Sequence, residues 1–346
     1  MRRSESENME LGIARSLLAM FLAILPSMVK VPVYRLAGAK LGNRVSIGFG
    51  SFVLANSFSK VSIGDYSQIG QFTWIVCSEV SIGNYTHIAP FVWIWGAGCL
   101  KVGDKCYVGP RCIINVRRNN FEMGEYAGLG PGSVAYTHGQ WLPYTEGWPR
   151  TYGDIVLEDY SWVPARAFLC PGVRVGSKSI VGSGAVVTKD IPPLSFAAGV
   201  PARVIGSTTK MMNQIDEDEL FERAKKIATD LPDFLGLKST TIHLREGLEV
   251  VEFVRSKFLR KRECRLVVCK PEHVDDIVQH GFDPSRLVLF STGSLPEEFR
   301  KRSFAWFDLK SLKCGSLSDS FAFEIWEFLR KDWCVTCTVV AGKEDS

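Results

Sequence analysis

The sequence predicts a parallel β-helix of hexapeptide repeats, with an N-terminal capping helix and a small C-terminal α/β domain. Between Leu41 and Pro192 an aliphatic residue recurs about every six positions, usually followed by glycine or another small residue. A second small residue recurs four positions after the aliphatic one. Apolar residues with helical spacing precede this region, and alternating strand and helix patterns follow it.

Each hexad supplies one short strand and one corner, so three hexads close a triangular coil of about eighteen residues. The aliphatic residue is expected to point into the prism, and the glycine after it to allow a tight corner at positive φ. The fifth position should point inward near a corner and must be small. Val92 and Val173 are larger there, and Arg118 is an exception. The aliphatic pairs are Leu41-Gly42, Ile47-Gly48, Ile63-Gly64, Ile69-Gly70, Ile82-Gly83, Ile88-Ala89, Val102-Gly103, Val108-Gly109, Met123-Gly124, Leu129-Gly130, Val163-Pro164, Val175-Gly176 and Val181-Gly182.

The distance between equivalent positions gives the length of each coil. It is 19 residues from Ile63 to Ile82 and 18 residues from Leu157 to Val175. From Met123 to Leu157 it is 34 residues, so about sixteen residues leave the prism. We place this excursion at residues 138–154. Long excursions from a regular scaffold are more often functional than idle.

Residues 1–40 are predicted to form a helical cap. Residues 9–36 are apolar with helical spacing, but the longest apolar run, residues 17–25, is about half of what a bilayer span requires. Acidic neighbours offset Arg2 and Arg3, so the positive lead of a signal peptide is missing. A cap would cover apolar residues and strand edges at the open end of the solenoid. A peripheral membrane contact through this helix, with Lys30 and Arg35, is the alternative.

The β-helix is predicted to span residues 41–206, because the hexad ends after Gly206. Residues 207–346 are predicted to form a helical linker, with an amphipathic helix at 216–231 ended by Pro232, and a small α/β domain of unknown role. Its apolar runs alternate with helical patterns, which favours a largely parallel sheet. A basic run at 255–262 is typical of a solvated helix face, with contact to a phosphate-bearing acceptor as the alternative.

Composition excludes some classes of function and compartment. A net charge of +4 on 346 residues does not favour a nucleic-acid partner. Ten cysteines lack the spacing of a disulfide framework, which indicates reduced thiols and a cytoplasmic location. Cys334 and Cys337 form a lone pair without flanking histidines, so they do not favour a zinc or redox site.

The second half of the repeat region carries two distinctive motifs. THG stands at 137–139, and SWVPARAFLCPGVRVGSKSIVGSGAVVTKDIPPLSFAAGVPARVI stands at 161–205. With these motifs the chain resembles the hexapeptide-repeat acyltransferases of the sugar O-acetyltransferase type, and weaker repeat similarity reaches back to Leu41. The resemblance implies a left-handed coil, a homotrimer, and acetyl-CoA bound in a groove between neighbouring prisms.

The resemblance places the catalytic base at His138, where the chain leaves the prism. Transfer of an acetyl group from a thioester to a hydroxyl needs a base, an oxyanion donor and a channel that orients the thioester. A histidine with an ordinary pKa near ~6.5 suits the first role. A base histidine is usually held in one tautomer by a carboxylate or carbonyl, and Glu146 is our candidate, with Asp154 and a backbone carbonyl as rivals. The alternative for His138 is a hydrogen bond that anchors the loop.

The acceptor side is expected to involve Asn115, although the spacing to His138 also allows Asn119. Trp162 begins the segment WVPA and is implied to line the acceptor and thioester end of the groove. Four aromatic residues crowd the excursion, where they suit either a sugar ring or a self-packed loop. They are Trp141, Tyr144, Trp148 and Tyr152, with Trp141 as our candidate substrate contact.

The resemblance also implies the residues that meet coenzyme A. Only the main chain of Ala165 is expected to contact the pantetheine, because the usual polar side chain is missing there. Ser183 and Thr188 match family contact positions, with plain repeat packing as the alternative. Lys189 and Arg203 make physical sense as partners of the phosphates.

We therefore expect an enzyme, an acetyl-CoA-dependent and metal-independent O-acetyltransferase acting on a saccharide hydroxyl in surface polysaccharide or glycoconjugate biosynthesis. A β-helix carbonic anhydrase would need three histidines around zinc, and residues 41–205 hold only His87 and His138. A nucleotide-sugar N-acetyltransferase is the nearest alternative, and a non-catalytic scaffold is the second.

Overall fold

The computed structural model describes residues 16–139, 142–237, 239–245, 247–257, 260–279, 282, 287–317 and 319–340. The chain forms two compact units, residues 1–212 and residues 213–346. The division therefore falls at Met212 rather than at Gly206.

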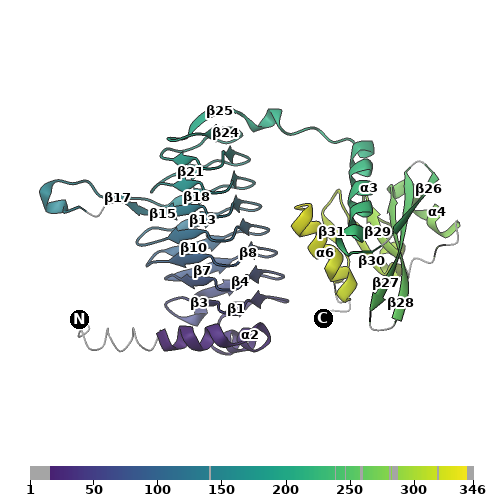
Figure 1. Cartoon of the computed structure of the whole chain (residues 1–346), viewed down its shortest axis with the longest axis horizontal. Helices are drawn as coiled ribbons and strands as arrows, with labels where there is room; N and C mark the ends of the chain where they lie inside the picture. The colour runs from purple at the N-terminus through teal and green to yellow at the C-terminus, as the bar shows by residue number, and fades with distance from the viewer. Residues whose placement is uncertain are drawn as a thin grey trace. The chain divides into compact units, whose positions relative to one another are not determined.

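The first unit is a parallel β-helix whose coils stack into three sheets (Figure 1). The first sheet holds β1 (Lys40–Leu41), β4 (Val61–Ile63), β7 (Glu79–Ile82), β10 (Cys99–Val102), β13 (Phe121–Met123), β18 (Ile155–Leu157) and β21 (Arg174–Val175). The second holds β2 (Ser46–Ile47), β5 (Gln68–Ile69), β8 (His87–Ile88), β11 (Tyr107–Val108), β14 (Gly128–Leu129), β19 (Trp162–Val163), β22 (Ile180–Val181), β24 (Ser195–Ala198) and β25 (Arg203–Ser207). The third holds β3 (Phe52–Leu54), β6 (Trp74–Val76), β9 (Trp93–Trp95), β12 (Ile113–Asn115), β15 (Val134–Tyr136), β20 (Phe168–Leu169) and β23 (Val186–Val187).

The small fifth position of the hexad is buried, as predicted, and it also links the coils. Ser67 is fully buried; its hydroxyl donates to the carbonyl of Gly83 at 2.6 Å and accepts from the N–H of Thr86 at 3.0 Å. The Thr86 hydroxyl repeats this pattern one coil further, with Gly103 and Cys106. A small hydroxyl therefore satisfies backbone groups at a buried corner that strand pairing leaves open.

The prediction that the glycine after the aliphatic residue adopts positive φ is wrong. Positive φ occurs two positions later, at Tyr66 (57°) in one coil and at Gly50 (75°) in another. The glycine has a different purpose, because a Cβ on Gly64 would lie only 2.6 Å from the backbone nitrogen of Asn84 in the next coil. Close stacking of the coils, rather than the turn, requires glycine there.

The N-terminal residues cover the open end of the prism. Residues 16–24 are helical, Pro26 interrupts the helix, and α2 (Ser27–Leu36) lies across the first coil (Figure 1). Leu22 and Tyr34 are buried in the core of the prism. The Tyr34 hydroxyl donates to the carbonyl of Val53 at 2.9 Å and accepts from its N–H at 2.7 Å. Two backbone groups of the terminal strand β3 are thereby satisfied.

Lys30 belongs to this cap and is fully buried, so it cannot take part in the membrane contact given above as the alternative. Its Nζ donates to the carbonyls of Gly48 and Ser51, both at 2.7 Å. Burial lowers the pKa of the amine to about 8. Within the described residues, no helix is both long enough and apolar enough to cross a bilayer.

The second unit is an α/β domain with a mixed sheet rather than the largely parallel one predicted. Strands β26 (Ser239–Arg245), β27 (Leu248–Lys257) and β28 (Arg260–Cys269) pair antiparallel. Strands β28, β29 (Leu287–Ser291) and β30 (Ala305–Asp308) pair parallel, and β31 (Lys313–Cys314) and β32 (Thr338–Val339) complete the order. The helices are α3 (Glu217–Phe234), α4 (Val274–Gln279), α5 (Glu297–Arg302) and α6 (Ser320–Asp332).

The basic residues of the run at 255–262, at positions 255, 257 and 260–262, lie on strands and not on a helix. Arg255 is opposite Arg262 where β27 pairs with β28. The segment before it, LEVVEFV, is rich in β-branched residues, which favour a strand over a helix. Pro232 also does not end α3, which continues to Phe234.

Candidate active site

His138 opens an arm that leaves the third sheet of the prism. It begins β16 (His138–Gly139), which pairs antiparallel with β17 (Thr151–Tyr152), so that His138 is opposite Tyr152. Figure 1 shows this arm projecting from the coils. The prism itself closes without it, because Phe121 of β13 pairs directly with Ile155 of β18.

Two backbone contacts hold the base of the arm. The N–H of Thr137 donates to the carbonyl of Asn115 at 3.0 Å, and the carbonyl of Thr137 accepts from the N–H of Gly153 at 3.1 Å. Thr137 is fully buried. A Cβ on Gly153 would collide with the Cα of Gly172 in the next coil. His138 is therefore placed by a tightly packed exit and return of the chain.

Three polar or aromatic side chains gather beside this exit. Asn115 pairs with Tyr136 between β12 and β15, so both side chains lie on the same face of the third sheet. The rings of Tyr136 and His138 meet edge to face, with centroids 5.8 Å apart. His138 Nδ1 and Asn115 Oδ1 are buried and have no hydrogen-bond partner among the described residues. Buried polar atoms normally bond, so Asn115 Oδ1 can accept a hydrogen bond from a bound molecule, and His138 Nδ1 can accept or donate one according to its tautomer.

The surroundings of His138 favour its neutral form. Burial lowers the pKa of the imidazole from its ordinary value, and the positive charge of Arg117 lowers it further. A neutral imidazole keeps one ring nitrogen with a free lone pair. At neutral pH this side chain can therefore accept a proton.

Neither predicted carboxylate orients this histidine. Glu146 lies in the 3₁₀ turn η2 (Tyr144–Glu146) and is exposed, and Nδ1 of His138 has no hydrogen-bond partner among the described residues. The carboxylate of Asp154 instead accepts the N–H of Asn120 at 2.7 Å. Glu146 does not orient His138 because it lies further out on the arm and is exposed. Asp154 does not orient it because its carboxylate is bonded to the backbone of Asn120 at a corner of the prism.

The described aromatic residues of the arm do not form a self-packed core. Tyr144, Trp148 and Tyr152 are exposed, and Trp141 lies outside the described residues. The guanidinium of Arg118 lies 5.6 Å from the ring centroid of Tyr152, which orders this ring at the base of the arm. Arg118, the exception to the small fifth position, is exposed and points away from the core.

Trp162 lies on a different face of the prism from His138. It stands on β19 of the second sheet, and its indole lies over Gly128 of the preceding coil. A Cβ on Gly128 would collide with this indole, so only glycine fits there. The ring of Tyr107 follows at 6.4 Å between centroids. Asn115 and His138 belong to the third sheet and its arm, so one chain does not bring them together with Trp162.

The predicted coenzyme A residues are spread over the last coils. Ala165 and Ser183 lie at corners between the second and third sheets, Thr188 and Lys189 follow β23 of the third sheet, and Arg203 begins β25. All of them except Ala165 are exposed. Exposure excludes core packing as the role of Ser183 and Thr188. The Arg203 guanidinium donates to the carbonyl of Ala202 at 2.9 Å.

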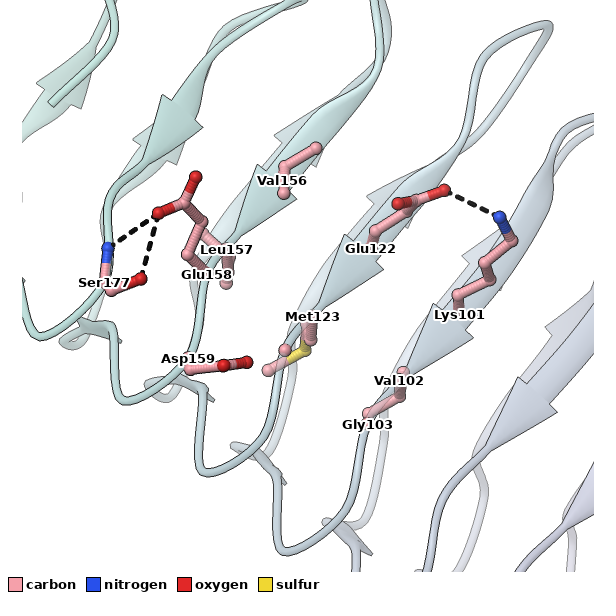
Figure 2. Close-up of a pocket in the computed structure, with 11 residues that line it drawn as sticks. Lys101, Val102, Gly103, Glu122, Met123, Val156, Leu157, Glu158, Asp159 and Ser177 are labelled. Atoms are coloured by element: carbon pink, nitrogen blue, oxygen red, sulfur yellow. Dashed lines mark hydrogen bonds and ion pairs between the residues drawn. The ribbon is translucent and has the colours of Figure 1, made fainter. Parts of the chain in front are cut away.

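A shallow groove of about 460 Å³ on the first sheet is built from pairs between coils (Figure 2). Lys101 pairs with Glu122 at 2.9 Å, and Glu158 accepts two hydrogen bonds from Ser177. None of the predicted site residues lines it. Its carboxylates would repel the phosphates of a nucleotide, so we assign these side chains to coil stacking.

Sequence reasoning missed several residues around His138. Tyr136 could have been found, because a residue two positions before His138 on a strand lies on the same face. Arg117 and Gly153 could not, because their effect depends on how the arm returns to the prism.

In the described part of the chain, no three histidine, cysteine, aspartate or glutamate side chains gather as metal ligands would.

Known proteins match parts of this chain. Galactoside O-acetyltransferase from Escherichia coli (strain K12) is 47% identical over 51 residues, 15% of this chain and 25% of that protein. An acetyltransferase-named protein from Staphylococcus aureus (strain MRSA252) is 38% identical over 68 residues, 20% of this chain and 33% of that protein. The chain resembles the hexapeptide-repeat acyltransferases. It spans a quarter to a third of the length of these two relatives.

Solved structures similar to this chain cover about 60% of its length. A hexapeptide-repeat acetyltransferase from Vibrio cholerae in complex with acetyl coenzyme A is 21% identical, covers 60% of this chain and 92% of its own, and has a TM-score of 0.32. An N-acyltransferase from Bacillus cereus in complex with dTDP and coenzyme A is 19% identical, covers 60% and 95%, and has a TM-score of 0.38. No family model matches the chain.

Proposed function

We propose that the chain is an acetyl-CoA-dependent O-acetyltransferase that acts on a saccharide hydroxyl of a surface polysaccharide or glycoconjugate. The observation that carries this proposal is the environment of His138. A half-buried imidazole with a lowered pKa stands where the arm leaves the prism, beside the buried amide oxygen of Asn115. The sequence similarity to proteins named acetyltransferases supports the same reaction.

In this reaction His138 accepts the proton of the acceptor hydroxyl as that oxygen attacks the thioester carbonyl. The C–S bond breaks, the new ester forms, and the departing thiolate takes the proton from the imidazolium. The protein then returns to its starting state without an oxidant, a reductant or a covalent intermediate. A base that is neutral before the reaction is required, and the lowered pKa of His138 provides it.

The acceptor is held on the third-sheet side of the site. Asn115 can bond a sugar hydroxyl through its buried Oδ1, and Tyr136 borders the same space. The exposed rings of Tyr144, Trp148 and Tyr152 provide flat faces for a sugar, and Trp141 of the same arm is the substrate contact proposed from the sequence. The exposed cations Lys189 and Arg203 supply charge for the phosphates of coenzyme A, with Ser183, Thr188 and the main chain of Ala165 along the pantetheine.

The site is completed between chains of a homotrimer. His138 and Trp162 lie on different sheets of one prism, so a groove that contains both must involve a neighbour. The third sheet also carries exposed aromatic rows that suit such packing. Trp74 and Trp93 stack at 5.6 Å between centroids and are 45% and 44% exposed. Stacked on each other, these rings present their edges outward, which suits protein packing better than sugar binding.

The test is acceptor-dependent release of the coenzyme A thiol. The purified chain is mixed with acetyl-CoA and matched pairs of sugars that carry either a hydroxyl or an amine at one position, and thiol release and acetylated product are measured. We expect O-acetylated product from at least one saccharide. Product from the amine sugars alone would assign an N-acetyltransferase instead, and no product with any acceptor would favour a scaffold.

A further inference from the structure

The outer surface of the N-terminal cap is apolar where a solenoid end needs to be polar. Solenoids require terminal caps with a polar outer face to stay soluble. Here the exposed side chains of the cap repeat with helical spacing and are large and hydrophobic. They include Leu17, Met20, Phe21, Ile24, Met28 and Leu36, whose exposure ranges from 55% to 90%.

These side chains lie opposite the buried face of the cap. Leu22, Val31 and Tyr34 pack into the core of the prism, so Ile24 and Met28 face away from it. Of the charged residues between 16 and 36, Lys30 is buried against the carbonyls of Gly48 and Ser51, which leaves Arg35 as the exposed charge. Within residues 16–36, the described part of the cap, the outer surface is therefore an apolar face without acidic groups.

Between Glu10 and Asp65 the charge of the chain has one sign. Residues 11–64 contain six basic residues and no acidic residue, although the whole chain is only +4. Lys40, Arg44 and Lys60 are exposed on the first coil, next to the cap. The first acidic residue after this segment, Asp65, is bonded to the N–H of Asn43 in the first coil.

We propose that this end of the prism binds the surface of an anionic membrane. An apolar helical face inserts into the boundary between headgroups and acyl chains, and nearby lysine and arginine residues add attraction to anionic lipids. A second copy of the chain with the same positive charge at this end would be repelled, so charge favours the membrane over end-to-end pairing. The inference does not depend on acyl transfer.

The test is co-sedimentation of the full chain with vesicles of phosphatidylcholine alone or with 30% phosphatidylglycerol (about a third anionic lipid, as suits electrostatic binding). We expect binding to the anionic vesicles that weakens as salt is raised. Ile24→Glu should weaken it at least ~10-fold, because a charge replaces an inserting side chain. Lys40→Gln with Lys60→Gln should weaken it ~5-fold or more per removed cation.

Matched controls lie after the last coil, where Met212→Glu and Lys210→Gln change residues that are also exposed and should leave binding unchanged. Met28→Glu repeats the apolar test at a side chain that is 81% exposed, so loss of folding does not explain both results. Equal sedimentation of wild type and Ile24→Glu would overturn the proposal. So would self-association in sedimentation velocity that Ile24→Glu abolishes while no vesicle binding occurs.

Discussion

At the residue scale, the protonation of His138 follows from what surrounds it. Burial and the charge of Arg117 both disfavour the imidazolium. The position of this histidine was predictable, because the excursion shows as a break in the hexad period. The effect of Arg117 was not predictable, because this residue comes from the preceding coil and meets His138 only after the two coils stack.

The pH dependence of turnover tests this environment. If His138 is the base, kcat/KM should fall on the acidic side as the imidazole gains a proton, with a midpoint below its ordinary value of 6.5. Arg117→Gln should move that midpoint upward, because it removes a positive charge, whereas Arg117→Lys should leave it nearly in place. If the midpoint of the pH profile is unchanged in Arg117→Gln, the charge of Arg117 does not lower the pKa of His138.

At the element scale, the arm depends on one glycine at its return to the prism. Gly153→Ala would drive a Cβ into Gly172, which should cost ~1–3 kcal/mol of stability and lower turnover by displacing His138. Gly139→Ala is the matched control on the same arm, since its Cβ would meet Pro171 and Thr151 at ordinary distances of 3.9 and 4.0 Å. Chemical denaturation and initial rates measure the two effects. If both variants lower stability and turnover equally, the contact between Gly153 and Gly172 does not position the arm.

The cap helix contains a second testable element, the buried amine of Lys30. Its pKa is about 8 in the folded chain against an ordinary 10.5, so between these values the unfolded chain holds a proton that the folded chain lacks. Stability should therefore rise with pH across that window, by up to ~3 kcal/mol for this group.

Denaturation from pH 7 to 10 compares wild type with Lys30→Met, which should lack this rise. Lys60→Met, at an exposed lysine, is the control and should keep it. The same slope in wild type and Lys30→Met would show that the amine is not the titrating group.

At the scale of the whole molecule, the period of six predicted the prism and its strands well. The prediction from the hexad was wrong only in the role of its glycine, which was expected to allow a turn at positive φ. The glycine is needed for close stacking of neighbouring coils, and the sequence of a single repeat does not show this contact. The second unit was harder to predict. Its alternating apolar runs predicted β28, β29 and β30. Strands β26 and β27 were missed, and in β27 the basic residues at its end also suit a helix face.

The second unit is expected to bind the acceptor or a partner rather than perform the chemistry. Removal of residues 213–346 should leave slow hydrolysis of acetyl-CoA by the β-helix within a few-fold of wild type. The KM for the best saccharide acceptor should rise at least ~10-fold, as loss of one binding surface predicts. Full activity of the shortened chain on that acceptor would remove this role.

The most direct measurement compares His138→Asn with wild type under saturating acetyl-CoA and acceptor. Asparagine keeps a polar side chain of similar reach but cannot accept the proton. The account predicts a rate lower by ~10²–10⁴, with affinity for coenzyme A and the assembly state unchanged. A variant that turns over as fast as wild type in a correctly assembled protein would contradict it.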